Sequence, residues 1–298
     1  MTRASTSPGK ALRRSIRDAT ISIPGAPIAL AARLIEREGF EAVYLSGAAL
    51  SAGVFGVPDI GIVTLDQLVE QTRSIAAAID IPLIVDADTG FGGPDAVADC
   101  VRRLEQAGAA AIQLEDQRWP KRCGHLPGKE LVDASEMAEK IAAAREALRD
   151  ENTVIIGRSD ARGVTGLDDC LARLSAYRDA GADWLFPEGL TSRAEFARVG
   201  SDLGIAGGVP LVANMTEFGV SPLISLPDLA VMGFAGVLFP VTLLRLAMKA
   251  MEAGLGILSD EGTQESLLDL MQTREELYDL LDYDPSRPEN HLQDRRPS

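Results

Sequence analysis

The sequence predicts an α/β protein whose eight parallel strands close into a (β/α)8, or TIM-type, barrel. One unit recurs along the chain: an amphipathic helix, a glycine near the end of that helix, and a short apolar strand that finishes on polar residues. The strands are almost continuously apolar, which is typical of a parallel sheet covered by helices. Eight strand candidates within about 240 residues match the size of one such barrel.

The elements follow one another in a regular order. The first strand is predicted at residues 21–23, and each later strand is preceded by its helix. The predicted helix and strand pairs are 29–38 with 42–47, 65–79 with 82–88, 97–106 with 111–116, 135–148 with 154–160, 167–179 with 184–188, 194–203 with 210–214, and 227–232 with 236–240.

A doubly wound open sheet is the alternative fold. No glycine-rich G-x-G-x-x-G turn follows the first strand, which counts against a dinucleotide-binding version of that fold. Beyond Ala253 the pattern predicts helices at 263–271 and 275–281. We therefore expect a single barrel domain over residues 1–298, with the barrel at about 18–250, a helical extension at about 251–283 and a loose polar tail at 284–298.

Composition narrows the class of protein. The chain has 298 residues, of which 46% are hydrophobic, so it can bury a large core. Its net charge of −15 argues against nucleic acid as the main partner, because phosphate binding needs a basic surface. Three widely spaced cysteines suggest a reducing compartment rather than a disulfide framework. With no secretory signal and no membrane-spanning run, we expect a cytoplasmic protein that binds no membrane.

The three cysteines fall into two kinds. Cys100 and Cys170 lie on apolar stripes with helical spacing, which predicts core packing. Cys123 lies in the loop after the fourth strand, next to Lys121, Arg122, Gly124 and His125. Positive charge nearby favours the thiolate, so we expect Cys123 to be available for chemistry.

Other interpretations of this cluster remain open. It could be a solvated basic turn with an incidental cysteine. A zinc site would lack further Cys or His ligands. A Cys–His nucleophile is conceivable, but His125 is only two residues from Cys123 and the other histidine, His291, lies in the tail. The thiol could equally act as a proton donor.

Polar residues follow the predicted strands at the end where β/α barrels carry their reactive groups. Asp86 and Asp88 are two residues apart in a strand, so both side chains are expected on one face. Two carboxylates side by side need a cation between them, and oxygen ligands with few histidines favour Mg²⁺ or Mn²⁺. The alternative is that one aspartate caps the next helix and the other pairs with Arg158.

Arginines and amides supply candidate groups for binding carboxylates. Arg158, Arg245 and Arg274 suit bidentate carboxylate binding, although a lone arginine is more often part of a surface pair. Glu188 follows another strand, where it could instead cap a helix. Residues 214–216 offer amide and hydroxyl groups, with a simple turn as the alternative.

Several motifs together resemble the isocitrate lyase/phosphoenolpyruvate mutase superfamily. They are Val85-Asp86-Ala87-Asp88 with Gly90-Phe91-Gly92, Glu115-Asp116-Gln117, and residues 121–125. The thiol-bearing segment narrows the resemblance to the carbon–carbon lyase branch. Residues 214–219, 261–264, 271–274 and 276–278 extend it, so that it covers roughly residues 10–283.

The resemblance implies a barrel with a swapped C-terminal helix, a homotetramer, and Mg²⁺-dependent cleavage of 2-methylisocitrate to pyruvate and succinate in the methylcitrate cycle of propionate catabolism, with Mn²⁺ as a possible substitute. It implies metal binding by Asp86 and Asp88, directly or through water, and by Asp59 and Glu115 through water. The substrate-binding positions that it implies are Ser46, Gly47, Ala48, Cys123, Gly124, Arg158, Glu188, Asn214, Met215, Thr216, Arg245 and Arg274.

The implied mechanism gives the remaining residues their roles. A metal bound there would make the substrate hydroxyl more acidic, and Tyr44, at a strand end, is the candidate base, with simple packing as its alternative. Arg158, Arg245 and the Lys121-Arg122 pair would stabilise the developing dianion. Cys123 would then donate a proton, helped by His125 and Glu188, from a loop that closes over the substrate.

Three rival functions differ in substrate or class. A sister lyase could act on isocitrate or 2,3-dimethylmalate, distinguished by the pocket around Phe186 and Pro240. An oxaloacetate decarboxylase is disfavoured because Cys123 would have no clear task. A non-catalytic dicarboxylate-binding protein is disfavoured because metal, thiol and cationic groups occur together.

Overall fold

The computed structural model describes residues 7–287, and each predicted strand is present within them. The predicted residues 288–298 of the loose tail, with His291, lie outside the described range. The strands are β1 (Ile21–Pro24), β2 (Val43–Leu45), β3 (Leu83–Asp86), β4 (Ala111–Glu115), β5 (Val154–Ser159), β6 (Trp184–Pro187), β7 (Val212–Asn214) and β8 (Gly236–Phe239).

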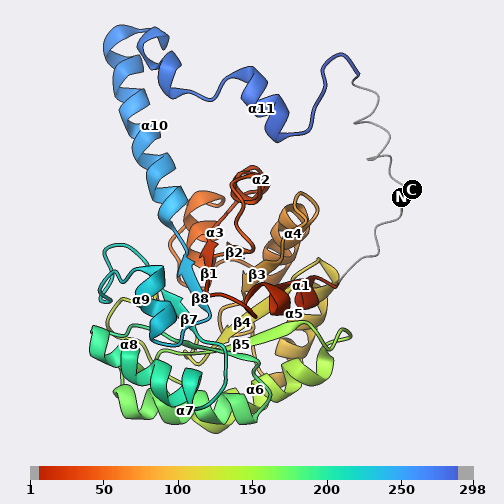
Figure 1. Cartoon of the computed structure of the whole chain (residues 1–298), viewed down its shortest axis with the longest axis vertical. Coiled ribbons are helices and arrows are strands. Elements are labelled where there is room, and N and C mark those ends of the chain that lie inside the picture. Colours follow the sequence, from red (N-terminus) through yellow and green to blue (C-terminus); the bar gives the residue numbers. More distant parts are fainter. Residues whose placement is uncertain (1–6, 288–298) are drawn as a thin grey trace. The chain divides into compact units, whose positions relative to one another are not determined.

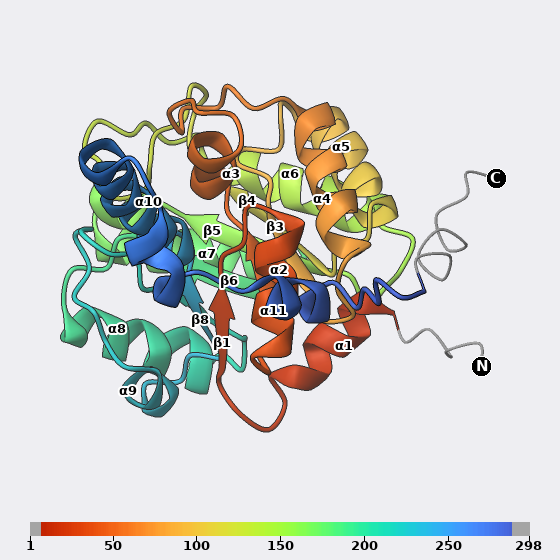
Figure 2. The ribbon, with the colours of Figure 1, turned by 90° about the horizontal axis from the view of Figure 1, so that it is seen from above.

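The strands are parallel and follow one another around a ring in chain order. Strands β2 to β6 form one sheet, and β1, β8 and β7 form a second. Parallel bridges between Gly25 and Tyr44 and between Leu185 and Leu211 connect the two sheets on both sides. The ring is therefore closed as a barrel, with the helices outside it (Figures 1 and 2).

Alternating residues of each strand build two separate cores. Tyr44, Ile84 and Ile156 belong to an inner cluster that fills the barrel. Val43 and Val85, which have the opposite parity, belong to the larger cluster that includes the helix residues. This alternation follows from the two-residue period of a strand, and it explains why the strands are apolar on both faces.

Helices cover the barrel between successive strands. Glycines with positive φ end several of them; Gly108 (φ +104°) and Gly181 (φ +111°) are two, and such a conformation is costly for other residues. The helices of the barrel are α1 (Pro8–Ser15), α2 (Ala29–Arg37), α3 (Gly47–Gly53), α4 (Leu65–Ala76), α5 (Pro94–Gln106), α6 (Ala134–Ala147), α7 (Leu167–Asp179), α8 (Arg193–Val199) and α9 (Leu226–Val231).

The structure differs from the predicted elements at several places. Helix α1 was not expected; its Leu12 is fully buried in the inner cluster, so α1 covers the end of the barrel where the strands begin. Helix α3 is also additional. The predicted helix 194–203 is α8 followed by a π-helical turn, Gly200–Ile205, and the predicted helix 263–271 is a 3₁₀ segment, Glu265–Leu270.

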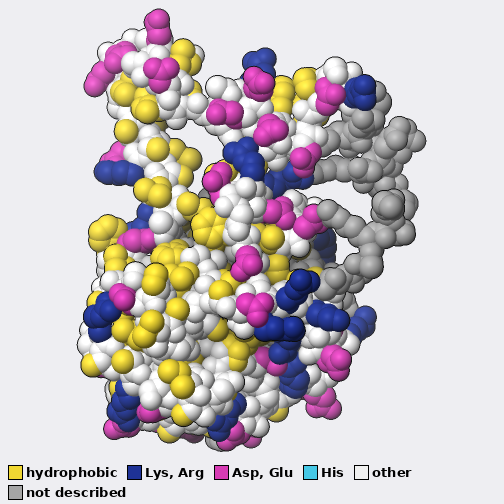
Figure 3. Space-filling view, in the orientation of Figure 1, with side chains coloured by type: hydrophobic (Ala, Val, Ile, Leu, Met, Phe, Trp, Pro, Cys, Tyr) yellow, Lys and Arg dark blue, Asp and Glu magenta, His cyan; other side chains and the backbone are white. Residues whose placement is uncertain are grey.

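The chain divides into two compact units, Met1–Leu244 and Arg245–Ser298. The second unit therefore begins a few residues before the predicted extension, and it contains most of α10 (Thr242–Glu261), the 3₁₀ segment and α11 (Arg274–Leu280). No residue of α10 is buried, and hydrophobic side chains are visible along it (Figure 3). Within residues 7–287, no helix is long and apolar enough to cross a membrane.

Candidate active site

Residues from six strand ends and two loops meet around a small cavity at the carboxyl end of the barrel. The cavity has a volume of about 60 Å³. Among the predicted site residues, those that line it are Tyr44, Ser46, Ala48, Asp59, Asp86, Lys121, Arg122, Cys123, Gly124, His125, Arg158, Glu188, Asn214 and Thr216. Phe186 and Pro240, the predicted specificity residues, also line it.

Asp86 and Asp88 lie side by side, but not because they alternate along one strand. Strand β3 ends at Asp86, and Asp88 has a left-handed backbone with φ of 50°. Both carboxylates nevertheless reach Gly47, where a Cβ atom would lie 3.2 Å from Asp88 Oδ1 and 3.3 Å from Asp86 Oδ2. An unfavourable backbone at a non-glycine residue is typical of functional sites.

A lysine ammonium lies against this pair. Lys121 Nζ is 2.8 Å from Asp88 Oδ1, and it also pairs with Asp59. Burial raises the pKa of Asp88 to about 6, in spite of the opposing charge of Lys121. The predicted alternative, in which Asp86 or Asp88 pairs with Arg158, is not what the structure contains: the ion-pair partners of Arg158 are Glu115, Asp160 and Glu188.

The oxygen atoms here fit a hydrated divalent cation. Asp86 is held by the Gln113 amide (3.0 Å) and the backbone N–H of Gly47 (3.2 Å). Glu115 Oε1 is buried without a hydrogen-bond partner, and burial raises the pKa of Glu115 well above its usual value. No group of three or more metal-ligating side chains occurs among residues 7–287, so water would supply most ligands. Mg²⁺ characteristically keeps several waters.

Arg158 is a buried cation with fixed orientation. Its Nε donates to Asp160 Oδ2 (2.9 Å), and its Nη1 lies 3.3 Å from Glu115 Oε2. The guanidinium carbon is 5.3 Å from the centre of the Phe186 ring, within cation–π range. Arg158 is thus a preorganised positive charge at the wall of the cavity.

His125 and Glu188 form a defined hydrogen-bonded pair. The backbone N–H of Val220 donates to His125 Nδ1 (3.0 Å), so the proton of the neutral ring is on Nε2, 3.0 Å from Glu188 Oε1. Asn214 Nδ2 donates to the other Glu188 oxygen (3.0 Å). Burial acts to raise the pKa of Glu188, but Arg158, His125 and Asn214 outweigh it and lower that pKa. Glu188 therefore faces the site as an anion and is not a helix cap.

Cys123 is the partly exposed cysteine of the three, while Cys100 and Cys170 are buried. Lys121, two residues before it, is paired with Asp59 and Asp88. Arg122 is exposed, and its backbone is held by the Gln117 amide. Both residues line the same small cavity as Cys123, so their effect on the thiol stays a prediction.

Tyr44 does not suit the general-base role predicted for it. Its hydroxyl is buried and donates to Gln113 Oε1. Burial, with further contributions from Asp86 and Glu115, raises the pKa of Tyr44 well above its usual value. A base must give up its own proton first, so the phenol is a hydrogen-bond donor here.

Some predicted residues lie apart from the cavity or outside the unit that contains it. Met215 is buried, and its sulfur accepts from the backbone N–H of Ile224, so its side chain belongs to the core. Gly47 is the first residue of α3, and Ser46, which does line the cavity, caps that helix by accepting from Ala49 N–H (3.3 Å). Arg245 and Arg274 belong to the second unit, so their roles stay predictions.

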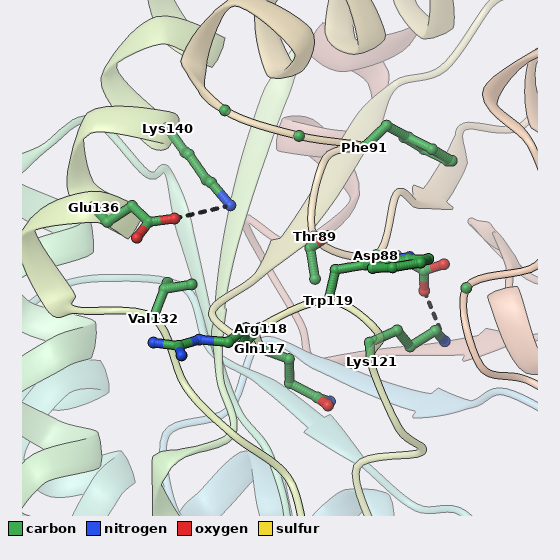
Figure 4. A pocket seen from close by; sticks show the side chains of 13 residues that line it. Asp88, Thr89, Phe91, Gln117, Arg118, Trp119, Lys121, Val132, Glu136 and Lys140 are labelled. Atoms are coloured by element: carbon green, nitrogen blue, oxygen red, sulfur yellow. Dashed lines mark ion pairs between the residues drawn. The ribbon is translucent and has the colours of Figure 1, made fainter.

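A second, larger cavity of about 560 Å³ adjoins the first and shares Lys121 with it. Figure 4 shows Lys140 pointing into this space beside Glu136, and the Asp88–Lys121 ion pair at its other side. Two glutamines of the site were not anticipated from sequence. Gln113 is hydrogen-bonded to Tyr44 and Asp86, and Gln117 is hydrogen-bonded to the backbone of Arg122. A glutamine inside the apolar strand 111–115 is the signal that marks Gln113.

Comparisons with known proteins agree with this geometry. The chain matches the family model described as phosphoenolpyruvate phosphomutase over residues 14–258. A probable 2-methylisocitrate lyase of Corynebacterium glutamicum is 47% identical over 281 residues, covering 94% of this chain and 90% of the relative. The 2-methylisocitrate lyase of Aeropyrum pernix is also 47% identical, over 277 residues, covering 93% of this chain and 88% of the relative.

Solved structures share the whole fold. A 2,3-dimethylmalate lyase superposes with a TM-score of 0.89 at 37% identity, covering 97% of this chain and 96% of that chain. A phosphonopyruvate hydrolase in complex with oxalate and Mg²⁺ superposes with a TM-score of 0.85 at 29% identity, covering 97% of this chain and 99% of that chain.

Proposed function

The chain belongs to the phosphoenolpyruvate mutase/isocitrate lyase superfamily, and from this premise we propose that it cleaves 2-methylisocitrate to pyruvate and succinate. Relatives named for this activity are 47% identical over nine-tenths of the chain. The observation that carries the proposal is the position of Cys123. A thiol in a loop above paired aspartates and a fixed arginine is suited to protonate a carbanion.

The metal would be Mg²⁺, with Mn²⁺ as a substitute, held by Asp86 and Asp88 and by Asp59 and Glu115 through water. When bound, Mg²⁺ supplies Lewis acidity toward the hydroxyl and carboxylate of the fragment that becomes pyruvate. The unpartnered Glu115 Oε1 and the grouped carboxylates support this assignment.

The protein's own groups then handle charge and protons. The hydroxyl proton passes to solvent water, a carbonyl forms, and the carbon–carbon bond breaks with its electron pair on the succinate carbon. Arg158 stabilises the charge that develops on that fragment, with Lys121 nearby and Arg245 as a further predicted contributor. The Cys123 thiol gives its proton to the carbon and completes succinate. Glu188 holds His125, the residue that follows Cys123 and Gly124 in the loop, in place.

The cavity between the loop and the strand ends is small, about 60 Å³, and substrate has to pass the loop to reach it. We propose that residues 121–129, named here the Cys123 loop, open to admit substrate and close to exclude water from the carbanion.

We also propose a homotetramer in the cytoplasm. Helix α10 has no buried residue, although Leu246, Met251 and Leu255 are among its side chains. Exposed apolar faces of this kind favour burial against another copy of the chain, which agrees with the predicted swapped helix. The three free cysteines support a reducing compartment.

A sister activity on 2,3-dimethylmalate is the second candidate. It is favoured by the fold match to a 2,3-dimethylmalate lyase at 37% identity. The pocket wall of Phe186 and Pro240 would decide between the two substrates.

A substrate panel tests the proposal. The purified protein is incubated with 2-methylisocitrate, isocitrate, 2,3-dimethylmalate or oxaloacetate, each with Mg²⁺ and with excess chelator, and pyruvate and glyoxylate are measured separately. We expect pyruvate from 2-methylisocitrate and reversible loss of that activity in chelator. Glyoxylate from isocitrate at comparable efficiency would overturn the specificity, and full activity in chelator would exclude the metal site.

A further inference from the structure

Lys129 is a buried lysine at the C-terminal end of the Cys123 loop. Its side chain is 3% exposed. The ammonium donates to the backbone carbonyl of Gly124 and to Asp160 Oδ1, at 2.9 Å from the latter. Burying an ammonium is costly unless it is paired and hydrogen-bonded, and both partners here are specific.

The first partner, Gly124, is the residue next to Cys123. A Cβ atom at Gly124 would lie 2.6 Å from Glu188 Cγ and would also collide with the Arg158 guanidinium. The backbone at Gly124 is thus pressed against the two charged groups of the cavity wall. The Lys129 ammonium donates to the Gly124 carbonyl, and this hydrogen bond joins the two ends of the loop segment 124–129.

The second partner, Asp160, belongs to the rigid frame of the barrel. Its carboxylate accepts from Arg158 Nε (2.9 Å) and Nη2 (3.2 Å), and its backbone N–H donates to Asp116 Oδ1 (2.9 Å). Asp160 Oδ1 therefore accepts from both Lys129 and Arg158. One carboxylate oxygen connects the loop to the cation that faces the substrate.

We propose that Lys129 is a positioning residue that fixes the closed conformation of the Cys123 loop. It joins the Gly124 carbonyl to Asp160, and in this way it sets where the Cys123 thiol stands relative to Arg158. Lys129 touches neither substrate nor metal. The consequence for catalysis rests on the proposed function of Cys123, whereas the consequence for loop conformation does not.

Two kinds of measurement test this, on Lys129→Met, Lys129→Arg and the control Lys140→Met. Lys140 is also a buried lysine, but it lies on α6 and its ion-pair partner is Glu136 at 3.6 Å. The first readout is backbone hydrogen exchange of residues 118–131 in the protein without ligand. We expect faster exchange in Lys129→Met, partial recovery in Lys129→Arg, and wild-type exchange of this segment in Lys140→Met.

The second readout is steady-state kinetics with 2-methylisocitrate. A misplaced loop should lower kcat by about 100-fold in Lys129→Met, with a much smaller change in KM, because a displacement of about 1 Å can cost that much. If Lys129→Met proves unfolded by circular dichroism, Lys129→Gln, which keeps a donor, takes its place in both measurements.

The outcomes separate this inference from the proposed function. Unchanged exchange and unchanged kcat in a folded Lys129→Met protein would overturn the positioning role. A lowered melting temperature with wild-type loop exchange would reduce Lys129 to a structural residue, which also overturns it. If the wild-type protein turned over no 2-methylisocitrate and Lys129→Met still showed faster loop exchange, the positioning role of Lys129 would be supported and the proposed function rejected.

Discussion

Glu188 is kept ionised inside the protein by three neighbours. His125 Nε2 lies 3.0 Å from one carboxylate oxygen, and Asn214 Nδ2 and Arg158 Nη2 lie 3.0 and 3.5 Å from the other. The side chain of Glu188 is 1% exposed, so its charge depends on these partners. This carboxylate fixes His125, a residue of the Cys123 loop, to the frame of the barrel.

The protonation of Glu188 makes stability depend on pH. Its pKa is lowered in the folded protein, so the ionised carboxylate stabilises the fold above the unfolded-state pKa, and that contribution is lost as the pH falls. We expect Glu188→Gln to lower the free energy of unfolding at pH 7 by on the order of 3 kcal/mol, as for a broken buried ion pair. The difference should shrink below about pH 4, near the ordinary pKa of glutamate.

Urea unfolding of wild type and variant at several pH values, with chelator present throughout, measures this difference. A difference that stays constant from pH 7 to pH 3 would contradict the assignment of Glu188 as the buried anion.

Residue types identify many members of the site, but not their contacts. Polar residues at the ends of apolar strands point to Asp86, Arg158 and Glu188, because parallel strands end at one rim of a barrel. The side-chain directions of Lys121 and Arg122 depend on how the loop backbone turns, and no local pattern fixes that path. For the same reason, the ion pairs of Lys121 with Asp59 and Asp88 could not be predicted from the sequence.

At the scale of elements, the Cys123 loop is shaped by close backbone contact. Gly124 lies against Arg158 and Glu188, with room for a hydrogen atom but not for a methyl group. Lys129 and His125 hold the same segment from its two sides. These contacts hold the loop segment against residues at the ends of β5 and β6.

We expect Gly124→Ala to prevent closure. The added Cβ would lie 2.6 Å from Glu188 Cγ, and neither Glu188 nor Arg158 can move without breaking buried ion pairs. The turnover number should fall by about 100-fold, while the melting temperature changes little because the barrel itself is untouched. Leu126→Ala is the control, since Leu126 is 56% exposed in the same loop. Steady-state kinetics and a thermal melt give the result, and wild-type turnover by Gly124→Ala would show that the contact is not needed.

Periodicity predicts the repeated elements well and the exceptions poorly. The eight strands and the main helices follow from the alternation of apolar strands with amphipathic helices, and the structure confirms them within residues 7–287. Periodicity does not predict helix α1, because no strand of the repeat precedes it. Helix α1 places Leu12 in the inner cluster, at the end of the barrel. Helix α3 is a short insertion after β2 that the repeat does not require.

At the scale of the whole molecule, an acidic protein handles acidic substrates by concentrating a few cations at one rim. The net charge is −15, yet Arg158, Lys121 and Lys129 are buried beside the cavity. Each is paired with carboxylates, so these cations are fixed in place before substrate arrives. Stabilisation of the transition state by such preorganised charge is the largest single contribution to the rate enhancement of many enzymes. The sequence predicts the barrel that gathers these groups, whereas the roles of Arg245 and Arg274 depend on the second unit.

Pyruvate formation by Cys123→Ser measures whether Cys123 is the proton donor of a carbon–carbon lyase, as proposed. The matched control is Cys170→Ala, because Cys170 is buried in α7, away from the cavity. Both variants are compared with wild type under identical Mg²⁺ and 2-methylisocitrate concentrations, with circular dichroism and Mg²⁺ binding as checks on the fold and the metal site. We expect Cys123→Ser to lose turnover by about 10²- to 10⁴-fold, as for a missing general acid, and Cys170→Ala to keep it. Near-normal pyruvate formation by a folded Cys123→Ser protein would show that Cys123 is not the proton donor.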